Sequence, residues 1–232
     1  MLALISRPSR YLLSTLFCCL VFSTIVAVTA NETSGVLQRQ LLDAASREDA
    51  AAVRILLAQG VNIESRDARG RTALLVATHH NAINVARILI EAGADVNAMD
   101  NMSDSPYLYA GAEGRLEILR MTLDHGADLA SVNRYGGTAL TPAAHHGHVE
   151  TVDELLKTKI DIDQVNSLGW TALLEAVILG DGGPTYIEIV RLLIEAGANV
   201  NLADKDGETP LAHAVSKRYE EIAEMLRSAG AK

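Results

Sequence analysis

Apolar residues recur along most of the chain at the three- and four-residue spacing of amphipathic helices, and the helical stretches come in pairs. The second stretch of a pair carries a stripe of large aliphatic residues, such as Val85, Ile88 and Leu89. A glycine usually follows this stripe, and glycine can take the left-handed conformation that ends a helix. Short turns rich in Asp, Asn and Gly then lead to the next pair. The pattern predicts helix pairs joined by tight polar turns.

These features repeat at an interval of 33 residues. The position that follows the stripe holds Gly60, Gly93, Gly126, Lys159, Gly197 and Gly230, with one longer step of 38 residues before Gly197. The residues that open the first helix of each pair keep the same steps, and they are Thr72, Ser105, Thr138, Thr171 and Thr209. Such hydroxyl side chains can accept a hydrogen bond from a free backbone N–H of the first helical turn. A fixed interval of this length is typical of stacked repeats, each of which buries its apolar face on its neighbours.

The helix-opening motifs TALLVA, TALTPA and TPLAHA resemble those of the ankyrin repeat, whose signature is Thr-Pro-Leu-His-x-Ala with a 33-residue period. The pair Gly147-His148 is similar to the family as well. The resemblance covers roughly residues 36–232 and implies an all-α ankyrin-repeat solenoid of about six repeats, in which short β-turn or hairpin loops join the helix pairs. The repeats are expected at about 36–66, 67–99, 100–132, 133–165, 166–203 and 204–232, and the polar first and last repeats would cap the stack.

The N-terminal segment follows another pattern. Arg7 and Arg10 precede an uncharged run that ends in small residues at Ala30. This layout is typical of a secretory signal peptide, so residues 1–30 are predicted to be removed ahead of a short polar leader at 31–35. An uncleaved membrane anchor is the alternative, because about twenty apolar residues can span a bilayer. Both cysteines of the chain lie in this segment, so the cleaved protein would have no thiol or disulfide chemistry.

The charge and the motif content of the chain disfavour several classes of function. The chain has 20 Lys and Arg against 29 Asp and Glu, a net charge of −9. An acidic protein is a poor match for the phosphates of nucleic acids and for anionic lipid surfaces. The sequence contains no serine elbow, P-loop or dinucleotide-binding fingerprint. We therefore predict a protein that is not an enzyme and needs no cofactor.

The fifth repeat is five residues longer than the others, and residues 180–185 at its centre are rich in glycine. The surplus predicts a flexible loop between the two helices of this repeat. It is a tolerated insertion, a loop that contacts a protein or ligand, or an anion site made of backbone N–H groups. The stretches NRYGGTALTPA and LGWTALLEAVILGDGG resemble a subgroup of exported bacterial ankyrin-repeat proteins of unknown biochemical role.

Ankyrin-repeat proteins generally bind partners on their concave side, through the turn tips and the exposed edge of the first helices. The resemblance implies contacts at the matching positions of this chain. The partner-binding residues predicted from it, together with two acidic residues of the fifth repeat, are Arg69, Arg71, Arg134, Tyr135, His145, His146, Trp170, Glu175 and Asp181. Arg, Tyr and Trp are the residue types that dominate interface hot spots. Trp170 is either such a contact or a packing residue on the neighbouring turn.

The same residues allow two other interpretations. His145, His146 and His148 could bind a metal, but neighbouring residues of a helix do not share a face, so we predict no metal site. Glu175 and Asp181 could serve a ligand-binding or hydrolytic site around the glycine loop, which is the alternative function.

Together these features predict a protein-interaction scaffold of the bacterial cell envelope that binds an unidentified protein through its concave face. The predicted signal peptide favours the periplasm, with a secreted, effector-type protein or an anchored protein as alternatives. After cleavage we expect a monomer that contacts neither membrane nor nucleic acid.

Overall fold

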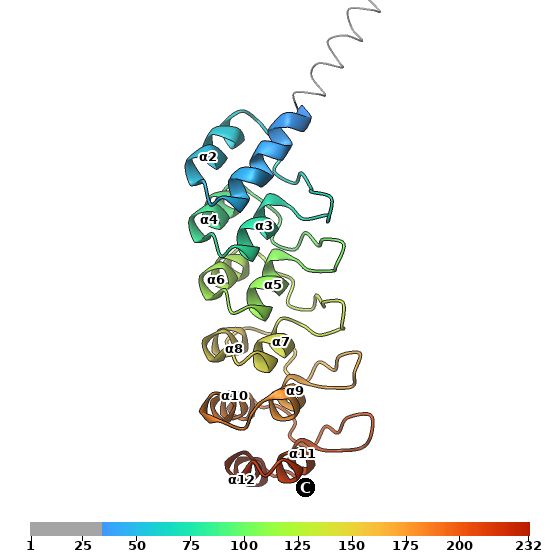
Figure 1. Cartoon of the computed structure of the whole chain (residues 1–232). Coiled ribbons are helices and arrows are strands. Elements are labelled where there is room, and N and C mark those ends of the chain that lie inside the picture. Colours follow the sequence, from blue (N-terminus) through green and yellow to red (C-terminus); the bar gives the residue numbers. More distant parts are fainter. Residues whose placement is uncertain (1–33) are drawn as a thin grey trace, which may run out of the picture.

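The computed structural model describes residues 34–232. The predicted signal peptide therefore lies outside the described residues. A helix over residues 34–46 and α2 (Ala50–Ala58) form the first helix pair, at the top of the stack in Figure 1. Five further pairs follow in chain order, and the C-terminus lies at the opposite end.

The pairs stack so that their helices form two columns, and the connecting turns project from one side (Figure 1). The inner column, next to the turns, consists of α3 (Ala73–His79), α5 (Pro106–Ala112), α7 (Leu140–His145), α9 (Ala172–Leu179) and α11 (Pro210–Ser216). The outer column consists of α2, α4 (Ile83–Glu91), α6 (Leu116–Asp124), α8 (Val149–Leu156), α10 (Pro184–Glu195) and α12 (Glu220–Ser228). Within residues 34–232 the only β pairing is one isolated bridge between Arg66 and Thr72. The predicted all-α solenoid is confirmed.

One core runs through the whole stack because each helix pair packs on the next. The alanine near the middle of each inner helix is completely buried, which lets neighbouring inner helices approach closely. These alanines are Ala77, Ala110, Ala143, Ala176 and Ala214. Within residues 34–232, no helix combines the length and the apolar character that crossing a membrane requires.

Four of the five predicted helix-opening residues act as N-caps. Their hydroxyl oxygens accept the backbone N–H three residues later at 3.1–3.2 Å, and they are Thr72, Ser105, Thr171 and Thr209. The prediction is wrong for Thr138, since α7 is preceded by Ala139 and has no side-chain cap. In the other repeats, the residue four positions after the cap donates its N–H to the carbonyl of the cap residue. Pro142 occupies this position in the fourth repeat and has no N–H to donate.

The surplus residues of the fifth repeat lengthen α10 more than they lengthen the loop. This helix has 12 residues, whereas the other helices of the outer column from α2 onward have eight or nine. Only residues 180–183 separate α9 from α10, so the predicted loop over residues 180–185 is too long. The Tyr219 hydroxyl donates to the Gly180 carbonyl at 2.8 Å. A Cβ at Gly180 would collide with the Ala176 carbonyl and the Tyr186 ring, so the close packing here requires glycine.

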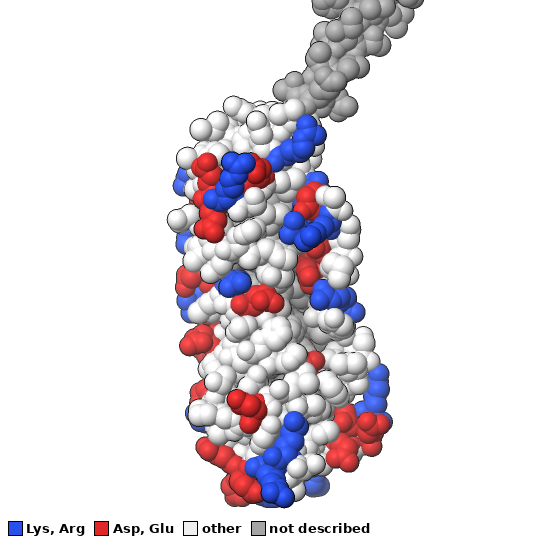
Figure 2. All heavy atoms as spheres, viewed as in Figure 1, with Lys and Arg blue, Asp and Glu red and all other residues white. Residues whose placement is uncertain are grey.

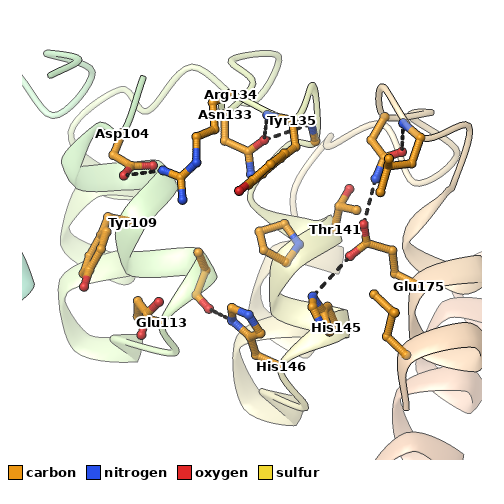
Figure 3. A pocket seen from close by; sticks show the side chains of 16 residues that line it. Asp104, Tyr109, Glu113, Asn133, Arg134, Tyr135, Thr141, His145, His146 and Glu175 are labelled. Atoms are coloured by element: carbon orange, nitrogen blue, oxygen red, sulfur yellow. Dashed lines mark hydrogen bonds and ion pairs between the residues drawn. The ribbon is translucent and has the colours of Figure 1, made fainter. Parts of the chain in front are cut away.

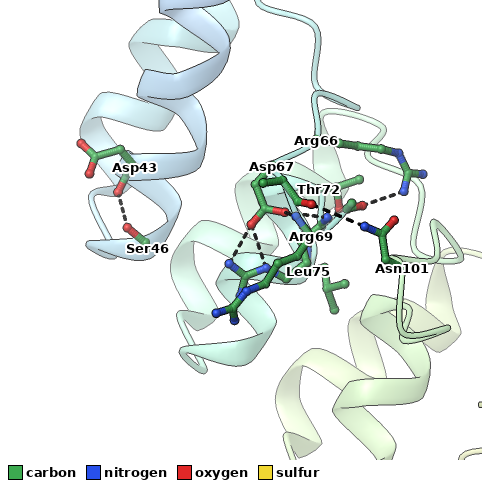
Figure 4. A network of polar contacts seen from close by, with 11 residues as sticks. Asp43, Ser46, Arg66, Asp67, Arg69, Thr72, Leu75 and Asn101 are labelled. Carbon is green, nitrogen blue, oxygen red and sulfur yellow. Dashed lines mark hydrogen bonds and ion pairs between the residues drawn. The ribbon is translucent and has the colours of Figure 1, made fainter. Parts of the chain in front are cut away.

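The turns share one hydrogen-bonding device. Each begins with an Asp or Asn whose Oδ1 accepts the backbone N–H groups two and four residues later, at 2.7–3.2 Å. These residues are Asp67, Asp100, Asn133, Asn166 and Asp204. The second carboxylate oxygen of Asp67 pairs with Arg71, and the Asn101 side chain of the next turn donates to the Ala68 carbonyl. Figure 4 shows Asp67 and Asn101 on these neighbouring turns. The row of turns is thereby ordered within and between repeats.

Candidate functional site

A cavity of about 420 Å³ lies on the turn side of the stack, between the inner helices and the turn tips. Its walls come from three consecutive repeats, with α5, α7 and α9 at its base (Figure 3). The cavity combines an apolar surface with acidic groups, among them Asp104, Glu113 and Glu175. It lies on the side that is concave in ankyrin-repeat proteins.

Glu175 is the most buried charged residue of this cavity. It belongs to α9, and only 7% of its surface is exposed. Its Oε1 accepts a hydrogen bond from the Asn166 side-chain amide at 2.7 Å, and its Oε2 lies 3.8 Å from Nδ1 of His145 (Figure 3). Burial raises the pKa of the Glu175 carboxyl from 4.5 to about 7, against the opposing effect of the Asn166 hydrogen bond. Glu175 is therefore partly protonated near neutral pH.

The two histidines at the C-terminal end of α7 differ in their contacts. Nδ1 of His146 lies 2.7 Å from the Ala112 carbonyl and donates to it, which ties α7 to α5. Burial lowers the pKa of His145, and the nearby His146 lowers it further. His145 is therefore mostly uncharged at neutral pH, and its approach to Glu175 is not a full ion pair.

The rim of the cavity is amphipathic. The Arg134 guanidinium lies over the Tyr135 ring, 4.9 Å from its centroid, and 3.4 Å from a carboxylate oxygen of Asp104. Burial raises the pKa of Asp104, and Arg134 partly offsets this effect. Tyr135, Leu168 and Leu179 line the cavity with 55%, 51% and 41% of their surfaces exposed. Large apolar side chains gathered in this way are typical of an interaction surface.

Five of the nine predicted partner-binding residues line this cavity, namely Arg134, Tyr135, His145, His146 and Glu175. The other four do not line it. Arg69 and Arg71 lie in the turn of the second repeat, where Arg71 pairs with Asp67 at 2.7 Å. Trp170 is half-buried in the turn of the fifth repeat. Asp181 is exposed on the loop after α9, and its carboxylate accepts the Gly183 N–H.

Several cavity residues were not predicted from the sequence, namely Tyr109, Asn133, Thr141, Pro142 and Asn166. A position-by-position comparison of the repeats would have found part of this set. Glu175 occupies the inner-helix position that holds Val76, Tyr109, Pro142 and His213 in the neighbouring repeats. Asn166 occupies the first position of the turn, nine residues before Glu175. In the sixth repeat the same two positions hold Asp204 and His213, so polar residues at both positions were the feature that could have predicted the contact.

The described part of the chain contains no cluster of side chains that could bind a metal ion. Among residues 34–232, no three His, Cys, Asp or Glu side chains lie close enough together to hold one metal ion. The rings of His145, His146 and His148 are neighbours, with centroids 4.7 Å and 5.9 Å apart, but one nitrogen of His146 already donates to Ala112.

The comparison with protein families agrees with this architecture. A family model described as "Ankyrin repeats (3 copies)" matches residues 41–133, 108–204 and 166–232. The chain belongs to the ankyrin-repeat family. Such repeats are in general modules for protein–protein interaction and typically carry no enzyme activity.

Solved ankyrin structures cover most of the chain. An ankyrin repeat domain from Acinetobacter baumannii AYE is 60% identical with a TM-score of 0.81, and the match covers 83% of this chain and 98% of that one. The ankyrin repeat protein EF0377 is 45% identical with a TM-score of 0.79, over 81% and 96% of the two chains. The ankyrin repeat domain of Bcl-3, a member of the IkappaB family, is 28% identical with a TM-score of 0.74, over 83% and 86%.

A curated relative matches over a shorter segment. The ankyrin repeat protein YahD of Escherichia coli K12 is 52% identical over 58 residues. The match covers 25% of this chain and 29% of YahD, so this chain spans less than a third of that relative.

Proposed function

We propose that this protein is a non-enzymatic scaffold that binds a partner protein at the cavity of the third to fifth repeats. The observation that carries the proposal is the cavity itself, on the partner-binding side of the family, with exposed Tyr135, Leu168 and Leu179 around a buried carboxyl. A concave site with an apolar wall and a few polar groups is the usual form of a specific binding site. The second repeat supports no comparable proposal, because Arg71 of its turn is paired with Asp67.

Partner capture tests this proposal. The purified protein serves as bait in an extract of the cell envelope, and bound proteins are compared between the wild type and the double variant Tyr135→Ala, Leu168→Ala. Loss of central apolar anchors typically costs about 2 kcal/mol, or roughly thirtyfold in affinity, so the double variant is expected to lose its partner. The control is Glu150→Ala, since Glu150 is exposed on α8 and does not line the cavity. An unchanged set of partners in the double variant would refute the proposed surface.

The cellular location is part of the same proposal. The basic start, the apolar run and the small residues before Asn31 support export to the periplasm. Sequencing the N-terminus of the protein purified from bacterial cells tests this directly. A chain that starts at Asn31 in the periplasmic fraction agrees with it, whereas a membrane-bound chain that starts at Met1 favours the anchored alternative.

A small-ligand site at Glu175 is a second candidate. The raised pKa of this carboxyl and the 3.8 Å approach of His145 support it, because perturbed pKa values cluster at functional sites. Asp181 and the glycine loop lie outside the cavity, so this candidate rests on Glu175 and His145. A metabolite that raises the Tm of the wild type but not of Glu175→Gln, without any protein partner, would favour it over the scaffold.

A further inference from the structure

Two positions of the repeat are joined by a polar contact in both the fifth and the sixth repeat. In the sixth, Nε2 of His213 lies 2.8 Å from Oδ2 of Asp204. In the fifth, the equivalent residues are Asn166 and Glu175, and the Asn166 amide donates to Oε1 of Glu175. The sixth repeat thus joins an acid to a base, whereas the fifth joins a carboxylate to a neutral amide.

Within residues 34–232, no group donates a hydrogen bond to the second oxygen of Glu175. Among the described residues, Asn166 is the only side chain that donates to this carboxylate, and Oε2 is 3.8 Å from His145, beyond hydrogen-bond distance. The side chain is 9% exposed and lines the cavity. Among the described residues, Oε2 is not one of the fully buried side-chain atoms that lack a partner, so it is accessible from the cavity, and a charged donor that enters the cavity can hydrogen-bond to it.

The charge of the cavity favours a cation as that donor. Asp104, Glu113 and Glu175 line it. Arg134 is the one Lys or Arg that lines it among residues 34–232, and that side chain is already held by Asp104 and the Tyr135 ring. In Figure 2 the middle of the stack is largely white, with the basic side chains mostly toward the two ends and along the turns. An incoming cation therefore meets little positive charge.

The walls of the cavity favour a cation on an apolar stem. Tyr135, Leu168 and Leu179 form exposed apolar surface above Glu175, and Pro142 adds to the wall. Lysine and arginine bury their methylene stems along such surfaces while the charged end reaches a polar group. Arginine binds carboxylates best through two parallel hydrogen bonds, one to each oxygen, but Oε1 of Glu175 already accepts one from Asn166 and has a single acceptor site left. A single free oxygen suits the compact ammonium group of lysine.

We propose that the cavity of the third to fifth repeats receives a lysine side chain of the partner protein, with its ammonium group donating to Oε2 of Glu175. This inference rests on the proposed scaffold function and specifies the chemistry that the partner must present. The lysine stem packs against Leu168, Leu179 and Pro142, so the contact combines apolar burial with one charge-assisted hydrogen bond.

Short peptides test this assignment without knowledge of the partner. The peptides acetyl-Ala-Lys-Ala-amide, its arginine analogue and its norleucine analogue, which lacks the ammonium group, are titrated at millimolar concentration into the isotope-labelled protein. Backbone amide shifts of α7 and α9 are followed by NMR. The lysine peptide is expected to bind about tenfold more tightly than the norleucine peptide and more tightly than the arginine peptide. Equal binding of the lysine and norleucine peptides, or no shift in α7 and α9, would overturn the proposal.

Two variants then locate the contact. Glu175→Gln keeps an acceptor for Asn166 but removes the charge, and we expect the lysine peptide to lose about tenfold in affinity. Glu150→Gln removes an exposed carboxylate of α8 and should change nothing. Equal losses in both variants would assign the effect to overall charge and refute the site.

The same variants in partner capture separate the two proposals. If Tyr135→Ala, Leu168→Ala releases the partner while Glu175→Gln retains it fully, the lysine contact is refuted and the scaffold surface stands. If the double variant also retains the partner, the scaffold surface itself is refuted.

Discussion

The fifth and sixth repeats join the same two positions through different polar contacts. In the sixth, the hydrogen bond from His213 holds the pKa of the Asp204 carboxyl below its ordinary value. In the fifth, burial raises the pKa of the Glu175 carboxyl to about 7, and a neutral amide is its only donor among the described residues. The acid of the sixth repeat is satisfied within its own repeat, whereas one oxygen of the buried acid in the fifth remains available to the cavity.

We interpret this difference as one between a contact that serves folding, in the sixth repeat, and the proposed binding contact of the fifth. A structural pair satisfies both of its partners, as Asp204 and His213 do at 2.8 Å. Burial of the Glu175 carboxyl lowers stability when the group is charged, and perturbed carboxyls of this kind are common at functional sites. Substitutions that make the two repeats alike should therefore separate stability from binding.

Asn166→Asp should have the largest effect on stability. It places a second carboxylate where Asn166 now donates to Glu175 at 2.7 Å, so the hydrogen bond is lost and two buried acids face each other. We expect a loss of about 3 kcal/mol in the free energy of unfolding near pH 8, measured by urea denaturation. Part of it should return near pH 5, where the pair can share a proton.

The matched control for this change is Asn133→Asp. Asn133 accepts the two equivalent N–H groups of its own turn through Oδ1, but in the described part of the chain no hydrogen bond joins its side chain to a carboxylate. This variant should lose less than about 0.5 kcal/mol. Losses of similar size in both variants would mean that the turn, rather than Glu175, causes the effect.

Converting the fifth-repeat pair into the sixth-repeat pair should reverse most of this loss. The double variant Asn166→Asp, Glu175→His creates the acid–histidine arrangement that joins Asp204 to His213. We expect it to regain about 2 kcal/mol relative to Asn166→Asp alone, while it fails to bind the lysine peptide. The measurement is a double-mutant cycle by urea denaturation, and additive losses would contradict the equivalence of the two contacts.

Glu175→Gln should change how stability depends on pH. The carboxyl titrates at 4.5 when exposed and at about 7 when folded, so between these values the native state binds the extra proton. Native stability therefore falls as pH rises through this range. The variant lacks this fall and should be more stable than the wild type by on the order of 2 kcal/mol near pH 8, with little difference near pH 4. If the curves of Tm against pH run parallel for the wild type and the variant, the raised folded-state pKa of Glu175 is contradicted.

His213→Ala should have the smallest effect and the opposite pH dependence. Because the folded-state pKa of Asp204 is lowered, its contribution is present above the ordinary pKa of 3.8 and is lost as pH falls through the lower folded value. The variant should therefore lower the Tm slightly at neutral pH and leave it unchanged in strong acid. Thermal unfolding followed by circular dichroism checks this, and a loss that persists in acid would point to packing instead.

The fold could be predicted because it depends on local patterns that repeat. The period of 33 residues, the capping hydroxyls and the buried alanines each specify one helix pair, and stacking then follows. Two details could not be predicted. Pro142 follows Thr138 in a repeat where Thr138 does not cap its helix, and the extra residues of the fifth repeat lengthen α10. Both details depend on contacts within one repeat and not on the repeating pattern.

The candidate site was predicted in part. Tyr135 and His145 were found because turn tips and inner-helix edges are the family's contact positions, whereas Glu175 was noticed as an acidic residue close in sequence to Asp181. Asn166 was missed because its role is a hydrogen bond between residues nine positions apart, which becomes visible only when the repeats are compared position by position. Asp181 was misplaced next to Glu175 because closeness in sequence does not bring the two side chains to one cavity.

Site-specific photo-crosslinking in living cells shows directly whether a partner protein binds at the cavity of the third to fifth repeats. A photoreactive phenylalanine derivative at position 135 should yield a crosslinked partner, whereas the same group at position 150, exposed on α8 in the same repeat, should not. An excess of the lysine peptide is expected to weaken the crosslink at position 135, and the norleucine peptide is expected to do so far less. Equal crosslinking at both positions, or none at position 135, would contradict the claim that this cavity is the binding site.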